Sequence, residues 1–423
     1  MEPVITFTLI FIATMLLLIA ELEHKVVVAL LAAVLTIYFG VSYGLFSLED
    51  IPEMMELDTL FFIVASFILF QSLESTGLFD FLSLYIVKKL KLGKKGTLLL
   101  LLLFSVVFSM VSSNYVVAVV MANVTLYMAR MYDFDPREPL MIEGVLANLG
   151  GLMLPISSIP GLIVSVKKGI GFLEFIKISG PLIAILTLIS LAYFIKFPIN
   201  KKACGEVELE EGKLVDKSTL YRSLLIFISF IVCIAISDKL GFSMTYIAFV
   251  FVVLMFMFSG LNPAEVMSRI NWEVPFFIGG FAIFVNGLES SGILGMVGEY
   301  VKAILTIESG ASVILLVLIC GFLSALIDNV PVVLLLLPIV DDVVASLNLR
   351  AYPLYWSLII GSGVGGGLTI YGSVPVLTMI SIAERKGYDI TVSDYSRKAA
   401  PLALLHLTVS AFYLWGLARL NIL

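Results

Sequence analysis

Two short polar segments interrupt long apolar runs, one in each half of the chain. One holds Ser113 and Asn114, and the other holds Asp328 and Asn329. Carboxylate, amide and hydroxyl oxygens suit a hard cation, whereas the free amides at a helix start suit an anion. Such groups are costly at membrane depth and usually functional there. The two segments therefore predict an ion-binding site, although Asn114 and Asn329 could act only as helix N-caps.

Paired glycines in the middle of two other apolar stretches provide a second kind of polar group. The pairs and the hydroxyl residues that follow them are Gly150, Gly151 and Ser158 in the first half, and Gly365, Gly366, Thr369 and Ser373 in the second. Each of the two serines stands two residues before a proline, and glycine and proline interrupt the helical hydrogen-bond ladder. The pattern predicts discontinuous helices whose free carbonyls and amides line the same site.

These features recur at a constant spacing of 215 residues, for example from Asn114 to Asn329. Other matches at this spacing are Ser109 with Ser324, Glu74 with Glu289, Gly151 with Gly366, Ser158 with Ser373 and Pro160 with Pro375. Composition alone would align leucine with valine, whereas these pairs are polar residues, glycine and proline. We therefore interpret the chain as an internal duplication, which is a common origin of carrier sites.

The composition places the chain in a lipid bilayer. Of its 423 residues, 60% are hydrophobic and 14% are charged, and the mean hydropathy is +1.08. Apolar stretches of helical length recur without the alternation of barrel strands, so the spans are predicted to be α-helices. The first, residues 4–20, follows no basic segment and is predicted to be a retained span. Two isolated histidines and three scattered cysteines support neither zinc nor nucleophilic chemistry, which favours a membrane transporter over an enzyme.

The positions of Lys and Arg predict the orientation. Most of the 26 basic residues fall on the inner side if the N-terminus lies outside, as the positive-inside rule requires. The two repeats then enter from opposite sides, which needs one non-crossing pair of helices in each. We assign these re-entrant hairpins to residues 97–130 and 311–340, with the polar segments at their tips. A helix over residues 97–111 would extend about 22 Å, less than a bilayer core of about 30 Å.

The predicted fold is an all-α polytopic membrane protein with two inverted repeats, each with a re-entrant hairpin and a discontinuous helix. About ten full spans accompany the two hairpins. The predicted units are N-terminal spans in 1–56, a first repeat in 57–197, a cytoplasmic linker in 198–220, connecting spans in 221–271 and a second inverted repeat in 272–423.

Several stretches carry a resemblance to the ion transporter superfamily. Asp328-Asn329-Val330-Pro331 resembles its hairpin-tip motif, and residues 365–373 resemble its Gly-Gly-x-x-Thr-x-x-Gly loop. Residues 134–137 and 382–388 resemble the melanosomal P protein. That branch also holds arsenite permeases, NhaD-type sodium/proton antiporters and citrate transporter-like domains. The resemblance implies a homodimeric carrier with a scaffold and a moving transport domain.

The resemblance also implies sodium sites between each hairpin tip and the neighbouring helix break. The implied residues are Ser109, Ser113, Asn114 and Gly151 in the first half, and Ser324, Asp328, Asn329 and Gly366 in the second. The chain departs from the P protein pattern at Ser113 and at residues 157–161, where that branch carries acidic residues, so Asp328 is the main acidic candidate at a tip. Glu143 lies in a broken span, where it could reach the cavity or cap the neighbouring turn, and Glu74 and Glu289 are expected to mark helix ends.

We expect an ion-coupled secondary active transporter that works by alternating access in an elevator-like manner. No Lys or Arg is near the tips in the sequence, which favours a small inorganic or organic anion or oxyacid of low charge, arsenite-like by resemblance. Sodium/proton exchange through Asp328 is the main alternative, and a gated channel and a membrane scaffold are weaker ones. Sodium or a proton is the expected coupling ion, without another cofactor. We expect the plasma membrane as the location and no nucleic acid as partner, and a soluble ATPase partner is left open.

Overall fold

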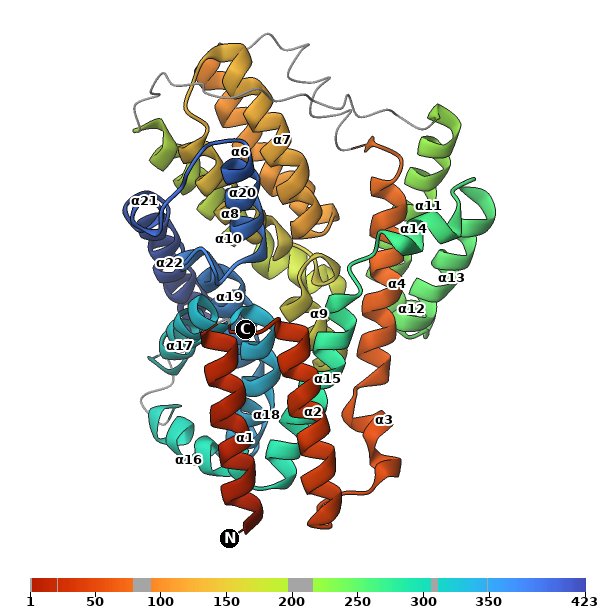
Figure 1. Ribbon diagram of the computed structural model, residues 1–423, viewed down its shortest axis with the longest axis vertical. Helices are drawn as coiled ribbons and strands as arrows, with labels where there is room; N and C mark the ends of the chain where they lie inside the picture. The colour runs from red at the N-terminus through yellow and green to blue at the C-terminus, as the bar shows by residue number, and fades with distance from the viewer. Residues whose placement is uncertain (1, 21, 79–92, 197–215, 306–310, 348) are drawn as a thin grey trace.

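The regular structure of the chain is helical throughout the part that the structure describes. The computed structural model, shown in Figure 1, describes residues 2–20, 22–78, 93–196, 216–305, 311–347 and 349–423, and these ranges contain no strand. Within them, nine helices are long and apolar enough to cross a membrane, or up to ten if the bent pair Glu273–Ser290 and Ile293–Lys302 counts as one span. The predicted all-α polytopic fold is confirmed.

The helices fall into four consecutive groups. The N-terminal group is α1 Glu2–Ile19, α2 Lys25–Ser42, η1 Leu48–Asp50, α3 Ile51–Met54 and α4 Leu57–Glu74. The next group is α6 Lys94–Val111, α7 Asn114–Tyr132, α8 Arg137–Gly151, η2 Pro155–Ser157, α9 Ile159–Lys168 and α10 Phe172–Ile195. The connecting group is α11 Lys217–Ala235, α12 Ser237–Leu240, α13 Met244–Phe258 and α14 Pro263–Ser268. The last group is α15 Glu273–Ser290, α16 Ile293–Leu305, α17 Ala311–Ile327, α18 Asn329–Leu347, α19 Ala351–Gly365, η3 Gly366–Leu368, α20 Val374–Arg385, α21 Val392–Lys398 and α22 Ala400–Arg419.

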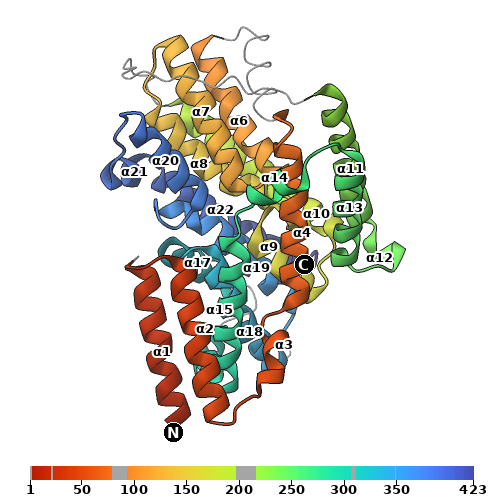
Figure 2. The ribbon, with the colours of Figure 1, turned by 45° about the vertical axis from the view of Figure 1, so that its right-hand side comes forward.

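The helices of the two halves begin and end at equivalent residues. α7 and α18 are both 19 residues long and start at Asn114 and Asn329, the spacing of the duplication. Figures 1 and 2 show α6 and α7 at one end of the long axis and α16 and α18 towards the other. In addition, α7 packs against α20 and α18 packs against α9, so each half contacts the broken helix of the other. The matching boundaries support the duplication, while the inversion of the repeats stays a prediction.

Both predicted discontinuous helices are present. α8 ends at Gly151 and α9 begins at Ile159, whereas α19 ends at Gly365 and α20 begins at Val374. A short 3-10 turn occupies each gap, and a proline stands in the first turn of α9 and of α20. Proline lacks an amide hydrogen, so it fits a helix start and cannot continue the ladder from the preceding helix.

The antiparallel pair α6 and α7 is longer than the predicted first hairpin. α6 begins at Lys94, because the three residues before the predicted apolar run form its first turn. Its 18 residues extend about 27 Å at 1.5 Å per residue. Both α6 and α7 are therefore long enough to cross a membrane. Helix length does not by itself indicate re-entry here, and the re-entrant assignment stays a prediction.

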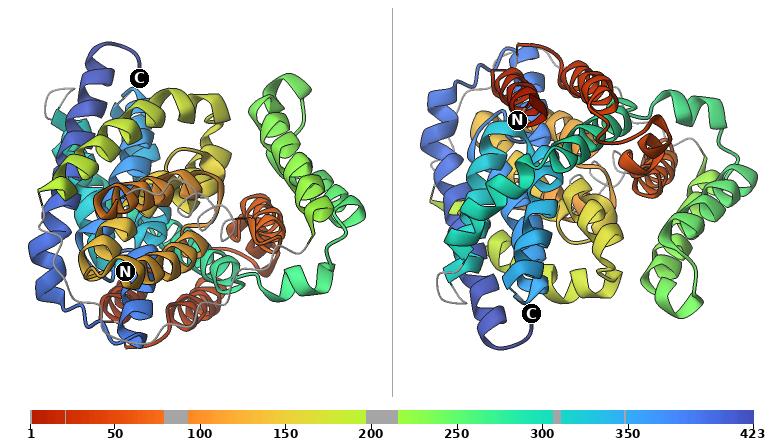
Figure 3. Two further views of the ribbon diagram at one scale, coloured as in Figure 1. Left: turned by 90° about the horizontal axis from the view of Figure 1, so that it is seen from above. Right: turned by 90° about the horizontal axis from the view of Figure 1, so that it is seen from below.

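A separate layer of helices lies beside the main bundle. Figure 3 shows α11 and α13 on one side of the molecule, with α4 between them and the remaining helices. The predicted linker, residues 198–220, falls mostly outside the described residues, and α11 begins near its end. The boundaries of the predicted units stay predictions.

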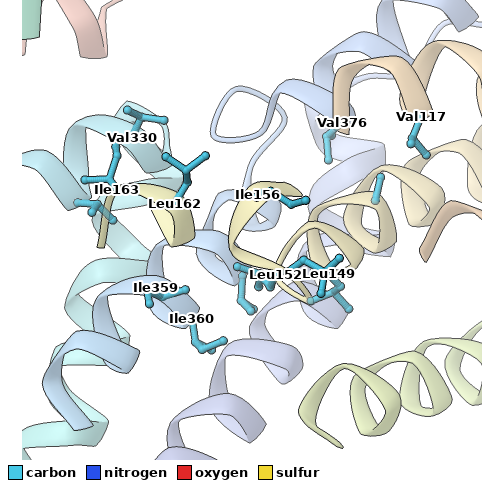
Figure 4. Close-up of a cluster of buried hydrophobic side chains, with 14 of the residues drawn as sticks. Val117, Leu149, Leu152, Ile156, Leu162, Ile163, Val330, Ile359, Ile360 and Val376 are labelled. Carbon is cyan, nitrogen blue, oxygen red and sulfur yellow. The ribbon is translucent and has the colours of Figure 1, made fainter. Parts of the chain in front are cut away.

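Apolar side chains from both halves fill the space around the helix breaks. Figure 4 labels ten of them, all at most 5% exposed: Val117, Leu149, Leu152, Ile156, Leu162, Ile163, Val330, Ile359, Ile360 and Val376. They come from α7, α8, the first break and α9 in one half, and from α18, α19 and α20 in the other. Close packing of this kind leaves little freedom for the backbone, so it fixes the breaks relative to each other.

Candidate functional site

The first tip packs directly on the first helix break. The hydroxyl oxygen of Ser109, on the last turn of α6, lies 2.5 Å from Asn114 Oδ1 and 2.5 Å from the Ala147 carbonyl oxygen in α8. A Cβ atom on Gly151 would lie 2.6 Å from Asn114 Oδ1, which is too close for any side chain. Three predicted residues, Ser109, Asn114 and Gly151, are therefore in contact, and a side chain at the third would displace the Asn114 amide.

Other predicted residues of the first half shape the backbone around this contact. Ser113 caps α7, since its hydroxyl accepts the Val116 amide at 3.5 Å. A Cβ on Gly150 would lie 2.2 Å from the Val106 carbonyl oxygen, so this glycine allows α6 and α8 to approach closely. Ser158 is buried at the start of α9 without a side-chain capping bond.

The second half repeats the contact between its tip helix and its broken helix. Ser324 Oγ donates to the Ser362 carbonyl oxygen at 2.7 Å, the same pairing as that of Ser109 with Ala147. A Cβ on Gly365 would lie 2.2 Å from Gly321 Cα, which matches the close approach at Gly150. The paired serines and glycines thus hold α6 to α8 and α17 to α19 in the same way.

The second break is closed by its own loop. Thr369 Oγ1 donates to the Ala325 carbonyl oxygen at 2.6 Å and accepts the Gly372 amide at 2.9 Å. A Cβ on Gly366 would meet the Gly372 carbonyl oxygen at 2.4 Å and Asn148 Nδ2 at 3.3 Å. Asn148 lies in the last turn of α8, just before the first break, so its amide reaches across to the second.

The predicted sodium set of the second half is only partly assembled. Asp328 Oδ1 accepts the Asn329 amide at 2.7 Å, so these two neighbours are in contact. Asn329 is not among the three atoms nearest to a Cβ on Gly366, whereas Asn114 supplies all three at Gly151. The two halves therefore differ at the place where the resemblance implies equivalent ion sites.

A lysine contacts the second tip, which corrects the expectation that no basic residue lies near the tips. Lys25 Nζ, on the first residue of α2, is 3.2 Å from Asp328 Oδ2. Lys25 also lies over the Phe277 ring of α15, 6.0 Å from its centroid. Asp328 itself has a left-handed backbone with φ of 69°, an uncommon conformation for a residue with a side chain. The pair is 303 residues apart in the chain, so no local pattern reveals it.

Buried polar atoms without a hydrogen-bond partner among the described residues occur along several helices, and some of them lie at the tips and breaks. They include Ser112 Oγ at the first tip, Asn148 Nδ2 at the first break and Ser373 Oγ at the second. All three side chains are at most 4% exposed. Buried polar groups are nearly always paired, so each of these atoms marks a place where an ion, a solute or water could bind. Of these three residues, only Ser373 is in the predicted site.

Glu143 is the buried carboxyl group of the first half. Thr125 Oγ1 of α7 donates to Glu143 Oε1 at 2.7 Å, and Oε2 has no partner among the described residues. The side chain is fully buried in α8. It therefore contacts a neighbouring helix rather than capping a turn. For Glu74 and Glu289, the helix-end reading agrees with the structure, because α4 and α15 end beside them.

Sequence reasoning also missed two side chains that bond to the breaks. Ser157 Oγ donates to the Gly151 carbonyl oxygen at 2.9 Å. Tyr395, a buried residue of α21, donates its hydroxyl to the Gly367 carbonyl oxygen at 2.5 Å. Ser157 stands within the predicted break, whereas nothing local in the sequence connects Tyr395 to Gly367.

A surface pocket of about 450 Å³ lies elsewhere, between α16 and α18. It is lined by Gly295, Gly298, Glu299, Lys302, Asp342, Val343, Ala345 and Ser346. None of the buried polar atoms without partners among the described residues belongs to this lining. We therefore take the tips and breaks, and not this pocket, as the candidate site.

Comparison with known proteins agrees with this architecture. The sequence model described as citrate transporter (CitMHS) matches residues 15–361 and 305–422. An uncharacterized transporter of Mycobacterium tuberculosis is 26% identical over 96% of each chain. The P protein of Mus musculus is 21% identical over 94% of this chain and 58% of its own length.

Two solved structures share the fold. The YdaH transporter of Alcanivorax borkumensis has a TM-score of 0.68 at 11% identity and covers 94% of this chain and 99% of its own. MtrF of Neisseria gonorrhoeae, described as one of a class of antimetabolite efflux pumps, has a TM-score of 0.64 at 13% identity and covers 96% and 97%. The chain belongs to the citrate transporter (CitMHS) family, and it is a multi-pass membrane protein and a secondary transporter, not an enzyme.

Proposed function

We propose that this transporter is an ion-coupled carrier for a small anion or oxyacid of low charge. The solute binds in the site that the two tips and the two breaks form. The observation that supports this best is that the buried side chains of Ser112, Asn148 and Ser373, at the tips and beside the breaks, each have a polar atom without a hydrogen-bond partner among the described residues. Asn148 faces Gly366, and Ser373 follows the loop that closes on Gly366, so the two halves meet there. A solute that accepts and donates hydrogen bonds would satisfy these groups.

The charge of the site favours a substrate of low charge. Lys25 is the basic group at the second tip, and its ammonium is already paired with Asp328. The net charge of this pair is zero, so a multiply charged anion would depend on helix amides or on bound cations. Arsenite, by resemblance, and monocarboxylates therefore form the low-charge part of the substrate panel, and citrate, named by the family, is its multiply charged comparison.

The same proposal includes the membrane arrangement. The carrier lies in the plasma membrane with its N-terminus outside and works as a homodimer in an elevator-like cycle. The distribution of basic residues supports the orientation, and the separate layer of α4, α11 and α13 supports a division into scaffold and moving parts.

Counterflow of labelled solute in proteoliposomes tests the proposal. Asn148→Ala should reduce exchange at least tenfold, because the amide that faces the second break is removed. Asn123→Ala is the matched control, since the Asn123 amide is satisfied within α7 by the Val119 carbonyl oxygen at 2.9 Å. Both variants should remain folded in detergent. Full exchange by Asn148→Ala, or no saturable exchange of any panel solute by the wild type, contradicts the proposal.

Sodium/proton exchange through Asp328 is a second candidate function. One observation favours it: the partly buried Asp328 carboxylate at the second tip lies beside the Lys25 ammonium. Dissipation of a preset pH gradient by sodium alone, absent in Asp328→Asn, would assign the exchanger. Dissipation only after addition of a solute would assign a coupled carrier.

A further inference from the structure

The two oxygens of the Asp328 carboxylate are both occupied. Oδ1 accepts the Asn329 amide at 2.7 Å, and Oδ2 lies 3.2 Å from the Lys25 ammonium. The Asp328 side chain is 21% exposed and that of Lys25 is 38% exposed, so the pair is only partly buried. A metal cation that takes the position of the ammonium at Oδ2 must displace it.

The partners of this ion pair come from different parts of the molecule. Lys25 starts α2, which packs against α1 and α15, whereas Asp328 forms the turn between α17 and α18. The Phe277 ring of α15 lies 6.0 Å from the Lys25 ammonium. An ammonium near an aromatic face keeps part of its stabilisation after it leaves a carboxylate. The ammonium can therefore separate from the tip without being left unpaired in an apolar environment.

We propose that Lys25 is a built-in competitor for a monovalent metal cation, sodium in the first instance, at the Asp328 carboxylate. In the empty carrier the ammonium neutralises Asp328, and the cation binds by displacing it. This inference rests on the proposed function because it names the coupling ion of that site. Lys25 then sets the cation affinity and is a positioning residue that never contacts the solute.

The competing interpretation is a purely structural ion pair that ties α2 to the tip. The two interpretations differ in one measurable way. A structural pair lowers stability when Lys25 is replaced but leaves cation affinity unchanged. If Lys25 is a competitor, replacing it raises the cation affinity of the site, because the positive charge of the ammonium no longer competes for the carboxylate.

Lys94 provides a matched control for Lys25. Each lysine is the first residue of an 18-residue helix, and each lies over a phenylalanine ring. Lys94 Nζ instead donates to the Asp133 carbonyl oxygen at 2.5 Å, far from the second tip in the chain. Lys94→Gln therefore removes the same charge from an equivalent helix position without touching Asp328.

The experiment measures thermal unfolding of the purified full chain in detergent against sodium concentration, with choline chloride holding ionic strength constant. Lys25→Gln should lower the half-saturating sodium concentration by on the order of tenfold, equivalent to about 1.4 kcal/mol. Lys94→Gln and Lys25→Arg should match the wild type, and Asp328→Asn should abolish the sodium response. Because no solute is present, the result is independent of the counterflow assay.

Three outcomes would overturn the proposal. One is the same half-saturating concentration in Lys25→Gln as in the wild type. Another is a sodium response that persists in Asp328→Asn. The third is the absence of any sodium response in both the wild type and Lys25→Gln, which would leave the pair as a structural tie while counterflow could still demonstrate the carrier.

Discussion

Replacing Gly151 by alanine should disturb the first tip through one side chain. The added Cβ would lie 2.6 Å from Asn114 Oδ1, 2.8 Å from Nδ2 and 3.1 Å from Cγ. All three atoms belong to the Asn114 amide, so the amide must move away from Ser109. Overpacking of this kind costs about 1–3 kcal/mol, and the displaced hydrogen bond adds about 1 kcal/mol. The better helix propensity of alanine offsets up to about 1 kcal/mol.

A double-mutant cycle isolates this contact. In an Asn114→Ala background the three clashing atoms are gone, so Gly151→Ala should be neutral or slightly stabilising. The expected coupling energy is about 1–3 kcal/mol. Gly365→Ala in the second half is the matched control, because its Cβ would meet the Gly321 Cα at 2.2 Å. That clash is with backbone, so its cost should be the same with or without Asn114.

The assay is unfolding in mixed micelles for the stability terms and solute counterflow for function. Both single variants at the tip, Gly151→Ala and Asn114→Ala, should lose transport, and the double variant should regain stability but not transport. Additive free energies for Gly151→Ala and Asn114→Ala would refute the packing of the tip on the break. Wild-type transport by Gly151→Ala would refute the role of this contact in the site.

Two further variants test groups outside this contact. Glu143→Leu should cost about 1–3 kcal/mol of unfolding free energy by leaving the buried Thr125 hydroxyl without its partner, whereas Glu143→Gln should cost less; equal losses would contradict the bond. In the loop before α8, burial tends to raise the pKa of Asp135, but hydrogen bonds and charge from Arg137 outweigh burial and hold that pKa below its usual range. The ionised Asp135 carboxylate therefore stabilises the folded state above a pH of about 4, and this stabilisation is lost as pH falls through the pKa of Asp135 in the folded state. The difference in melting temperature between wild type and Asp135→Asn should shrink on acidification, and a constant difference from pH 7 to pH 3 would contradict this.

The helix breaks could be predicted from sequence because their causes are local. A glycine pair followed closely by a proline disrupts the helical hydrogen-bond ladder locally, and Gly151 and Pro160 stand on either side of the first break. The contact of Ser109 with α8 followed from the same duplicated spacing that places Ser324 against α19. Repetition at a fixed spacing thus identified residues that share a role before their neighbours were known.

Contacts between distant segments could not be predicted in this way. Lys25 reads locally as a basic residue at a helix start, and its pairing with Asp328 depends on how α2 packs against the rest of the bundle. Asn148 reads as one polar residue in a break, and only the packing of the two halves turns its amide towards Gly366. The expectation of a site without basic residues was wrong for this reason, since it considered only sequence neighbours.

The difference between the two tips has a consequence for coupling. At the first tip the neutral Asn114 amide fills the space above Gly151, and this contact carries no charge. At the second tip the equivalent contact is absent from the atoms nearest Gly366, and Asp328 pairs with Lys25 instead. The two repeats therefore differ at their tips, because the first tip has a neutral contact and the second has an ion pair. Under the proposed exchange, a single monovalent cation replaces a single ammonium, so the tip that carries Asp328 keeps the same net charge with the cation bound as it has when paired with Lys25.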